Sequence, residues 1–336
     1  MKFFTIFFTL SILANSYFVK AESFIPAKLI NNHNTLNKTQ SATRLEGWAY
    51  VSYVIDIDGK VSDIDIIDIS DKEYFTARTK KYFEKLEFSP ATDGQGIIAS
   101  GQTLLLRLTK EGIGIGRYAV TPGFYTRYEQ ASELLSQQRF AEVEKLLTDM
   151  SSDNAKNLQE QALLYWIQGR YYYAQKEWDN YGQSIERAGY LHTDLPPSLA
   201  SKTLQNLYSW HLYKNQFFNA GQAIKAMTQL ENVEISEQSM DFLQQPINES
   251  LSSDKEFKLQ QTMLKGQSWV YQPLKLNFTI SMNAEQIGEI ALRCANRVND
   301  LTLSDVVKVT LAPSDKNCAV LIKAKDAAVI NITEHP

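Results

Sequence analysis

The residues best suited to chemistry lie near the start of the chain, where carboxylates alternate with aliphatic side chains. The segment Ile55–Gly59 reads Ile-Asp-Ile-Asp-Gly, and three more aspartates follow within the next nine residues. Closely spaced carboxylates beside a glycine are typical of calcium loops, in which oxygen ligands surround the ion. An EF-type loop also needs an oxygen ligand two residues after Asp58, and a glycine after that ligand. Lys60 stands at the ligand position and Gly59 comes too early, so we predict no calcium site here.

The same stretch has the two-residue period of a β-hairpin. Apolar and polar residues alternate over 51–58, and Asp58-Gly59 is a strong turn signal. A two-residue turn pairs Val51 with Ile66 and places the aspartates on the opposite face of the hairpin, whereas a bulge at Gly59 shifts the pairing by one residue. We predict that this acidic face is exposed to solvent.

We find no other catalytic or cofactor-binding pattern in the sequence. None of the four histidines has a second ligand at metal-binding spacing: His33, His192, His211 and His335. A nucleophile-elbow Gly-x-Ser-x-Gly motif and a phosphate-cradling loop are both missing. The glycines at 112, 114 and 116 are too closely spaced for a dinucleotide loop, and we predict a linker over 111–123. We therefore expect no enzymatic activity, no cofactor and no bound metal.

The composition is that of a folded protein of two or three domains. The chain has 336 residues, of which 44% are apolar, and its net charge of -4 gives no reason to expect nucleic acid as a partner. Lys2 is followed by an apolar run, and small residues end in Ala21, so we predict a cleaved signal peptide over 1–21. The alternative is an uncleaved N-terminal anchor. Residues 22–45 are polar and are expected to form a flexible lead-in.

Residues 46–110 are predicted to form two strands, a helix over 72–87 and a third strand over 100–109. This segment resembles the TonB C-terminal domain, and "FSPATDGQG" (88–96) is the most specific part of the match. The matching positions are Gly47, Val51, Tyr53, Ile55, Asp56, Gly59, Val61, Ile64, Ile66, Ser70, Phe88, Pro90, Ala91, Gly94 and Leu104–Leu108. The sequence departs from the family in lacking a Tyr-Pro pair before the first strand, a proline-rich spacer and a transmembrane anchor.

The resemblance implies a small ββαβ domain with an open sheet edge at its closing strand. Such an edge binds an extended segment of a partner by strand addition. The candidate partner-binding residues on that edge are Leu104, Leu105, Leu106, Arg107 and Leu108. Because the spacer and the anchor are missing, we do not expect the chain to transmit force as the family does.

Residues 124–232 are predicted to form a helical repeat. "SQQRFAEVEKLL" (136–147), "AQKEWDNYGQSI" (174–185) and "YKNQFFNAGQAI" (213–224) align at offsets of 38 and 39 residues. Ala131, Gly169 and Tyr208 fall at equivalent points of the first helices, and the pattern resembles the tetratricopeptide repeat. Stacked helix pairs leave a concave groove. Its candidate anchors are Tyr165, Trp166, Tyr171 and Tyr173, with packing inside and between repeats as the alternative.

Residues 257–336 are predicted to form a β-rich domain after a polar, helix-like start. Strands are expected at "KLNFTISM" (275–282), "IGEIALRC" (287–294), "DVVKVTLA" (305–312), "CAVLIKAK" (318–325) and "AVINITE" (328–334). Cys294 and Cys318 are the only cysteines of a chain predicted to be exported, which favours a disulfide over two buried free thiols.

Together these features predict a multidomain α+β protein in the periplasm of a Gram-negative bacterium. We expect a non-enzymatic adaptor that is linked to TonB-type envelope transport and binds protein partners in the cell envelope through the sheet edge and the helical groove. Two alternatives stay open. One is a TonB-family transducer held in the inner membrane by an uncleaved anchor, and the other is an envelope enzyme subunit with a site around Arg293, Asp300 and Asp305.

Overall fold

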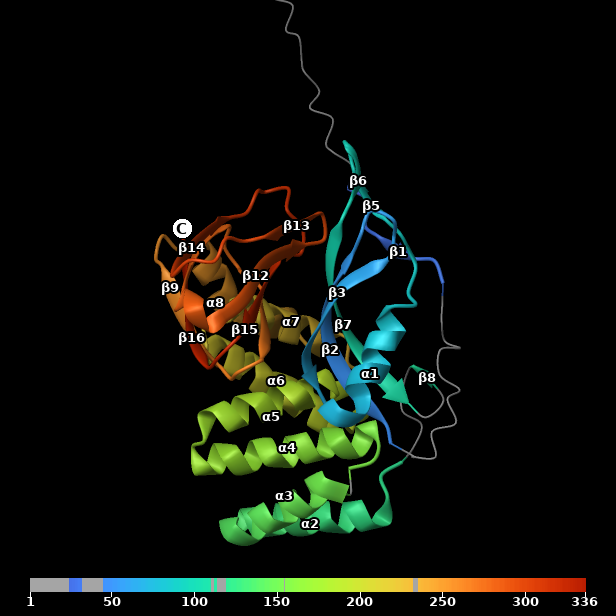
Figure 1. Cartoon of the computed structure of the whole chain (residues 1–336). Helices are drawn as coiled ribbons and strands as arrows, with labels where there is room; N and C mark the ends of the chain where they lie inside the picture. Colours follow the sequence, from blue (N-terminus) through green and yellow to red (C-terminus); the bar gives the residue numbers. More distant parts are fainter. Residues whose placement is uncertain (1–23, 32–44, 110–111, 114–118, 154, 232–234) are drawn as a thin grey trace, which may run out of the picture.

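The computed structural model describes residues 24–31, 45–109, 112–113, 119–153, 155–231 and 235–336. The chain is a mixed α+β protein whose three parts follow one another in the sequence: an N-terminal sheet, a helical array and a C-terminal sandwich (Figure 1). The predicted signal peptide lies outside the described residues. Within the described part of the chain, no helix has an apolar stretch long enough to cross a membrane.

The N-terminal sheet has the antiparallel strand order β3-β2-β7-β8. Its elements are β2 (Gly47–Ile55), β3 (Val61–Ile69), α1 (Lys72–Phe83), β7 (Ser100–Thr109) and β8 (Gly112–Ile113). Helix α1 begins after Asp71, whose carboxylate accepts a hydrogen bond from the backbone N–H of Tyr74, and it ends four residues before the predicted end. Phe75 and Phe83 of α1 are buried against alternate residues of β2, so α1 covers one face of the sheet.

The turn of the first hairpin is longer than predicted. Ile55 pairs with Val61, which leaves Asp56–Lys60 as the loop. Val51 still pairs with Ile66 because the register shifts between the first and second half of the hairpin. The Asp56 carboxylate accepts hydrogen bonds from the backbone N–H groups of Asp58 (2.9 Å) and Lys60 (2.8 Å), so it holds the loop together. Gly59 has a φ of 77°, which a residue with a side chain rarely adopts.

Two small antiparallel pairs flank the sheet. Strand β1 (Lys28–Leu29) pairs with β4 (Phe88–Ser89), and β5 (Ala91–Asp93) pairs with β6 (Gly96–Ile98). Ile25 also exchanges backbone hydrogen bonds with Thr92. The expectation of a flexible lead-in is therefore wrong for residues 25–31, because their backbone groups find partners some sixty residues further along the chain.

The helical array consists of three helix pairs and one further helix. Its members are α2 (Pro122–Ser136), α3 (Phe140–Asp153), α4 (Leu158–Gln175), α5 (Trp178–Tyr190), α6 (Pro197–Tyr213), α7 (Phe217–Thr228) and α8 (Glu237–Ser252), with the 3-10 turn η1 (His192–Asp194) after α5. Gln138, Lys176 and Asn215 each adopt a positive φ in the turn inside a pair. These positions are 38 and 39 residues apart (138 to 176 to 215), so the sequence repeat is also a backbone repeat. Helix α8 was not predicted.

The C-terminal sandwich packs two four-stranded antiparallel sheets, of order β10-β15-β12-β13 and β14-β11-β16-β9, around an apolar core. Its strands are β9 (Phe257–Met263), β10 (Ser268–Tyr271), β11 (Asn277–Ser281), β12 (Ile287–Cys294), β13 (Arg297–Asp300), β14 (Val306–Thr310), β15 (Ala319–Ala324) and β16 (Ala328–His335). Five of these strands were predicted. The stretch from Phe257, expected to be helix-like, is strand β9 instead, since its sparse apolar residues Leu259 and Met263 face the core.

The predicted disulfide is confirmed. Cys294 ends β12 and Cys318 directly precedes β15, and these two strands are neighbours in one sheet. The bond therefore links adjacent strands at one end of the sandwich.

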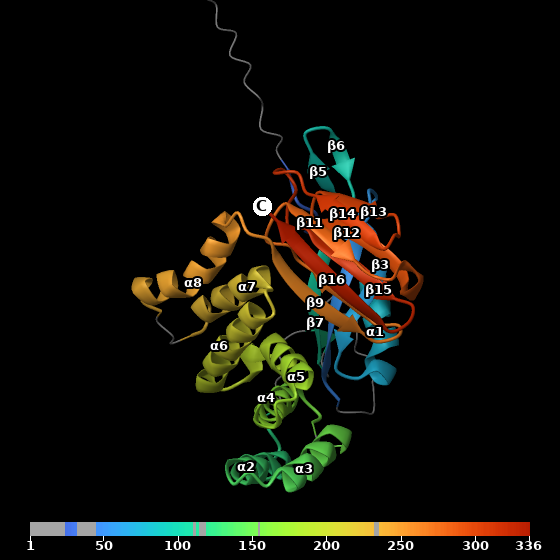
Figure 2. The ribbon, with the colours of Figure 1, turned by 90° about the vertical axis from the view of Figure 1, so that its left-hand side faces the viewer.

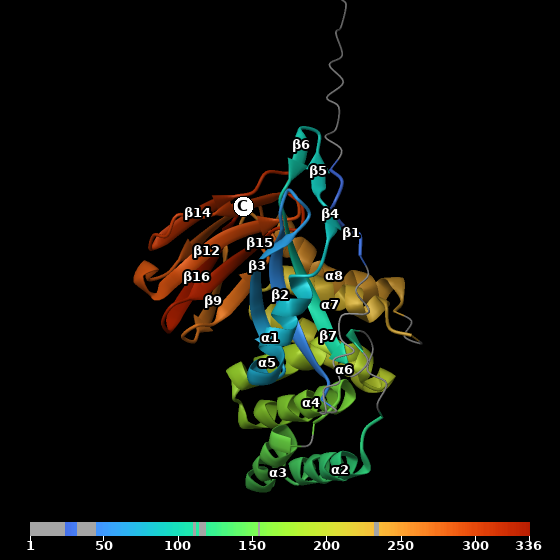
Figure 3. The same ribbon diagram turned by 45° about the vertical axis from the view of Figure 1, so that its right-hand side comes forward.

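The three parts pack around the N-terminal sheet. Figure 1 shows the helical array below the sheet and the sandwich beside it. Figure 2 shows the helices stacked from α2 and α3 up to α7 and α8, next to the sandwich. Figure 3 shows β3 and β2 between helix α1 and the rest of the molecule. Both the array and the sandwich contact the face of the sheet that α1 leaves free.

Candidate functional site

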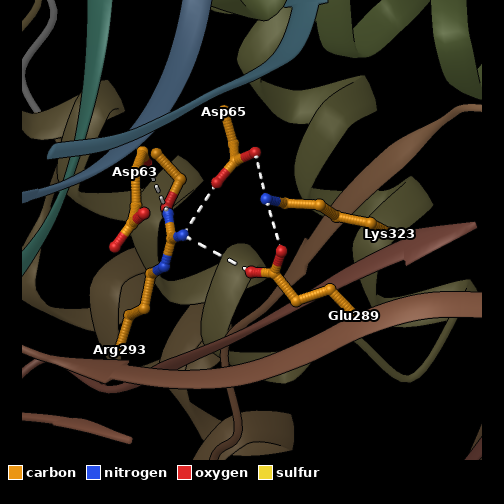
Figure 4. A network of polar contacts seen from close by, with 6 residues as sticks. Asp63, Asp65, Glu289, Arg293 and Lys323 are labelled. Atoms are coloured by element: carbon orange, nitrogen blue, oxygen red, sulfur yellow. Dashed lines mark hydrogen bonds and ion pairs between the residues drawn. The ribbon is translucent and has the colours of Figure 1, made fainter. Parts of the chain in front are cut away.

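The acidic face of the hairpin is an internal junction with the sandwich. Arg293 of β12 donates hydrogen bonds to the hydroxyl of Ser52 (2.9 Å), the carbonyl of Asp63 (3.2 Å) and the carboxylate of Asp65 (2.7 Å). Lys323 of β15 lies 2.7 Å from the other Asp65 oxygen. Figure 4 shows how these side chains converge. The prediction that this face is exposed to solvent is therefore wrong at Ser52 and Asp65, whereas Asp58 and Asp63 are exposed as predicted.

Glu289 completes this ion network from the sandwich side. Its carboxylate lies 2.7 Å from the Lys323 ammonium and 3.9 Å from the Arg293 guanidinium (Figure 4). The Arg293 and Asp65 side chains are only 4% and 11% exposed. Because little water reaches them, each charge is stabilised by the other. The network connects the N-terminal sheet to the sandwich, through residues that lie more than 220 positions apart in the sequence.

Backbone atoms also meet at this junction. A β-carbon added to Gly101 of β7 would lie 2.6 Å from the Arg293 β-carbon and 2.9 Å from its backbone. Only a glycine leaves room for strand β12 at that distance. The sandwich is therefore seated directly on the sheet.

The other half of the same face is the junction with the helical array. Asp68 of β3 accepts two hydrogen bonds from the Arg187 guanidinium of α5, at 2.7 and 2.9 Å. Trp48 of β2 is fully buried and packs against Tyr165 and Tyr190, with ring centroids 6.1 and 5.3 Å apart. The sheet and the helices thus share one apolar core.

Glu186 lies at this junction beside Asp68. Burial, together with the negative charge of Asp68, raises the pKa of Glu186 to about 7. A hydrogen bond from Trp210 and the positive charges of Lys214 and Arg187 oppose the rise only in part. The Glu186 carboxyl is therefore half-protonated near neutral pH.

We expect Glu186→Gln to stabilise the protein at pH 8 and to change its stability little at pH 5. The folded state holds the Glu186 proton more tightly than the unfolded state, so the stabilisation present at low pH falls as the pH rises through 4.5 to about 7. Gln has no such proton to lose. We expect a difference of about 1–2 kcal/mol at pH 8, allowing for screening by solvent.

Urea unfolding followed by circular dichroism at both pH values measures this difference. Comparing variants at each pH cancels the titration of other groups. The exposed Glu144 on α3 supplies the control, since Glu144→Gln should match the natural chain at both pH values. An equal gain from Glu186→Gln at pH 5 and pH 8 would contradict the prediction.

The predicted edge strand is β7, and its side chains point into three different surroundings. Leu106 and Leu108 are buried in the core beneath α1, whereas Leu105 packs against the helical array. Arg107 pairs with Asp194 of η1. Leu104 is exposed. Most of these side chains thus serve the protein's own packing.

The strand pairing of β7 leaves part of its backbone edge open, although most of its side chains are packed. Strand β2 pairs with β7 along its whole length, whereas β8 pairs only with Leu108 and Thr109. Among the described residues, the stretch 100–107 therefore has a strand partner on one side only. This stretch retains backbone donors and acceptors for an added strand.

The predicted aromatic anchors are mostly buried. Tyr165 contacts Trp48, Trp166 lies in a small core between α4, α5 and α6, and Tyr171 packs against Phe140. All three are less than a tenth exposed, whereas Tyr173 is 59% exposed. The alternative of packing within and between repeats therefore describes three of these four residues.

A groove that sequence reasoning missed lies between α6, α7 and α8. It has a volume of about 580 Å³, and its walls combine apolar and neutral polar side chains: Ser201, Gln205, Met227, Ile235, Gln238, Ser239, Phe242 and Leu243. Phe242 is 74% exposed and also borders a second hollow on the other side of α8. The helical spacing of Met240, Leu243 and Ile247, with Phe242 off that stripe, was the available signal.

The residues considered for an enzyme site do not converge. Arg293 is hydrogen-bonded and ion-paired in the junction with the sheet, while Asp300 and Asp305 are exposed. One Asp305 oxygen accepts a hydrogen bond from the backbone N–H of Ala284. The groove and hollow beside α8 and a hollow at one end of the sandwich are each lined by at most one of these three residues.

The chain matches no known protein-family model, and no curated protein is similar enough in sequence to count as a relative. The resemblances to the TonB C-terminal domain and to the tetratricopeptide repeat remain predictions from the sequence. The groove and the sheet edge are therefore the features from which a function can be inferred.

Proposed function

We propose that this protein is a non-enzymatic adaptor of the bacterial cell envelope that binds a segment of a protein partner in the groove between α6, α7 and α8. The observation that supports the proposal most strongly is the exposed Phe242 at the rim of that groove. A large aromatic side chain that is three-quarters exposed beside an apolar hollow is typical of a binding hot spot. The predicted export signal supports a periplasmic location.

The partner segment is amphipathic and basic. Helix α8 carries Glu237, Asp241 and Glu249 but no Lys or Arg, and all three carboxylates are exposed. Met227, Ile235 and Leu243 line the groove with apolar surface. An amphipathic helix whose apolar side fills the groove would bring its Lys or Arg residues to the carboxylates of α8.

The sheet edge offers a second place for a partner. In this proposal the N-terminal sheet is a TonB-like module and the helical array is a tetratricopeptide-like repeat. The stretch 100–107 of β7, which has a strand partner on one side only among the described residues, takes up an extended segment by strand addition. Because the Arg187–Asp68 ion pair and the shared core hold the sheet against the array, two sites on one rigid body raise the effective concentration of the second partner segment.

We expect Phe242→Ala to weaken peptide binding about tenfold, because it removes the side chain that contacts the partner on both sides of α8. The probe is a fluorescein-labelled 16-residue helix of Leu and Lys, with a Leu and Glu version as its charge-reversed counterpart. Fluorescence anisotropy with the mature chain measures both affinities. The basic peptide should bind more tightly than the acidic one.

The matched control is Leu264→Ala, which removes an equally exposed apolar side chain from the turn after β9. It should leave binding unchanged. Equal loss in both variants, or tighter binding of the acidic peptide, would overturn the proposal.

A further inference from the structure

A different hollow lies at one end of the C-terminal sandwich, away from the groove and the hollow beside α8. Its volume is about 500 Å³, and it lies where β9, β11 and β16 meet the loops that follow β11 and precede β16. The polar side chains that line it are Thr262, Ser281, Asn283, Gln286, Asp305 and Asn331. Five of these six are uncharged, and no Lys, Arg or His lines the hollow.

We propose that this hollow binds one unit of an uncharged oligosaccharide. Hydroxyl and amide side chains carry donors and acceptors side by side, and neighbouring sugar hydroxyls present the same combination. An anionic ligand would meet the Asp305 carboxylate without a compensating cation. Val329, which is 43% exposed, and the buried Met282 add an apolar surface for the C–H face of a sugar ring.

The protein already orients several of these groups. The side-chain oxygen of Asn331 accepts a hydrogen bond from the Gln260 amide (3.0 Å), so the amide N–H groups of Asn331 are directed away as donors. Asn283 is oriented in the same way, because its side-chain oxygen accepts from the backbone N–H of Glu285 (3.1 Å). One Asp305 oxygen accepts from Ala284 (3.0 Å), which leaves the other as an acceptor. Two oriented donors and one acceptor form a pre-organised site.

The outer face of the same sheet extends the hollow. Strand pairing places Gln260, Asn331 and Ser281 in one row across β9, β16 and β11. A second row places Thr333 and Thr279 between Lys258 of β9 and Lys308 of β14. The uncharged polar groups at the centre of both rows continue away from the hollow along the strands, which suits a chain of sugars better than a single one.

The test titrates the mature chain, labelled with nitrogen-15, with three neutral hexasaccharides: cellohexaose, maltohexaose and the hexamer of N-acetylglucosamine. We expect at least one of them to shift the backbone resonances of residues 281–286 and 327–331 with a Kd in the range of about 0.1–1 mM. A sulfated heparin hexasaccharide should bind at least tenfold more weakly.

The decisive variant is Asn331→Asp, which keeps the acceptor for Gln260 but removes both donors. We expect it to raise the Kd at least tenfold with an unchanged melting temperature. Asn248→Ala, on the exposed side of α8, is the control and should bind like the natural chain. No shift with any neutral hexasaccharide, a stronger response to heparin, or unchanged binding by Asn331→Asp would each overturn the proposal. None of these results depends on peptide binding at the α8 groove.

Discussion

Replacing Arg293 with Met should lower the free energy of unfolding by about 3 kcal/mol and separate the unfolding of the sandwich from that of the sheet. Met keeps much of the side-chain volume but leaves the nearly buried Asp65 carboxylate with Lys323 as its remaining cation. The Ser52 hydroxyl and the Asp63 carbonyl lose the same donor. The loss should therefore exceed that from any exposed ion pair.

Urea unfolding, followed by tryptophan fluorescence and by circular dichroism, measures both effects. The two signals should follow separate transitions in Arg293→Met. Lys265→Met is the control, because its ion pair with Asp326 is exposed and should contribute less than about 0.5 kcal/mol. A double-mutant cycle with Asp65→Asn should give a coupling energy of at least about 1 kcal/mol. A loss no larger than that of the control would show that the network does not hold the sandwich in place.

Truncating Trp48 to Ala should cost about 3–5 kcal/mol, the second large effect we expect. The Trp48 ring is fully buried between Tyr165 and Tyr190, where the sheet meets the helical array. These neighbours are held by α4 and α5, so they cannot move in to fill the space. The variant should also expose the junction to protease.

Thermal unfolding and limited proteolysis check this prediction. Trp178→Ala removes the same side chain from a position that is 43% exposed and should cost less than about 1 kcal/mol. New cleavage of Trp48→Ala is expected between the sheet and α2, with the sandwich left intact. Similar losses for the two tryptophan variants would contradict a shared core between the sheet and the array.

Local patterns in the sequence were sufficient for most elements. The strands at 47–55, 61–69 and 100–109 were expected from alternating apolar residues, and the repeat offset of 38 and 39 residues recurs in the backbone. Strand β9 and helix α8 were missed because few of their residues are apolar and none of α8 is fully buried. Their conformations depend on neighbours rather than on a strong pattern of their own.

The candidate site was harder to predict. Among the predicted binding residues, Leu104 and Tyr173 are exposed in the structure. The other three aromatic anchors are core residues. Helical spacing shows which residues share a face, but it does not show what covers that face. The groove at α8 forms only where α6, α7 and α8 come together, and these helices lie at 197–252.

The sequence by itself determined the three main strands and the helix of the N-terminal sheet, the helical repeat, the disulfide partners and five strands of the sandwich. Only the tertiary structure decided that the acidic face of the first hairpin is covered at Asp65 and Asp68. The alternation around Asp65 shows which side of the strand is polar, but a solvated face and an ion-paired junction have the same pattern. Asp68 joins this face only through the register shift between Tyr50 and Val51. Arg187, Arg293 and Lys323 neutralise these aspartates from 119 to more than 220 residues away, a separation that no local pattern reports.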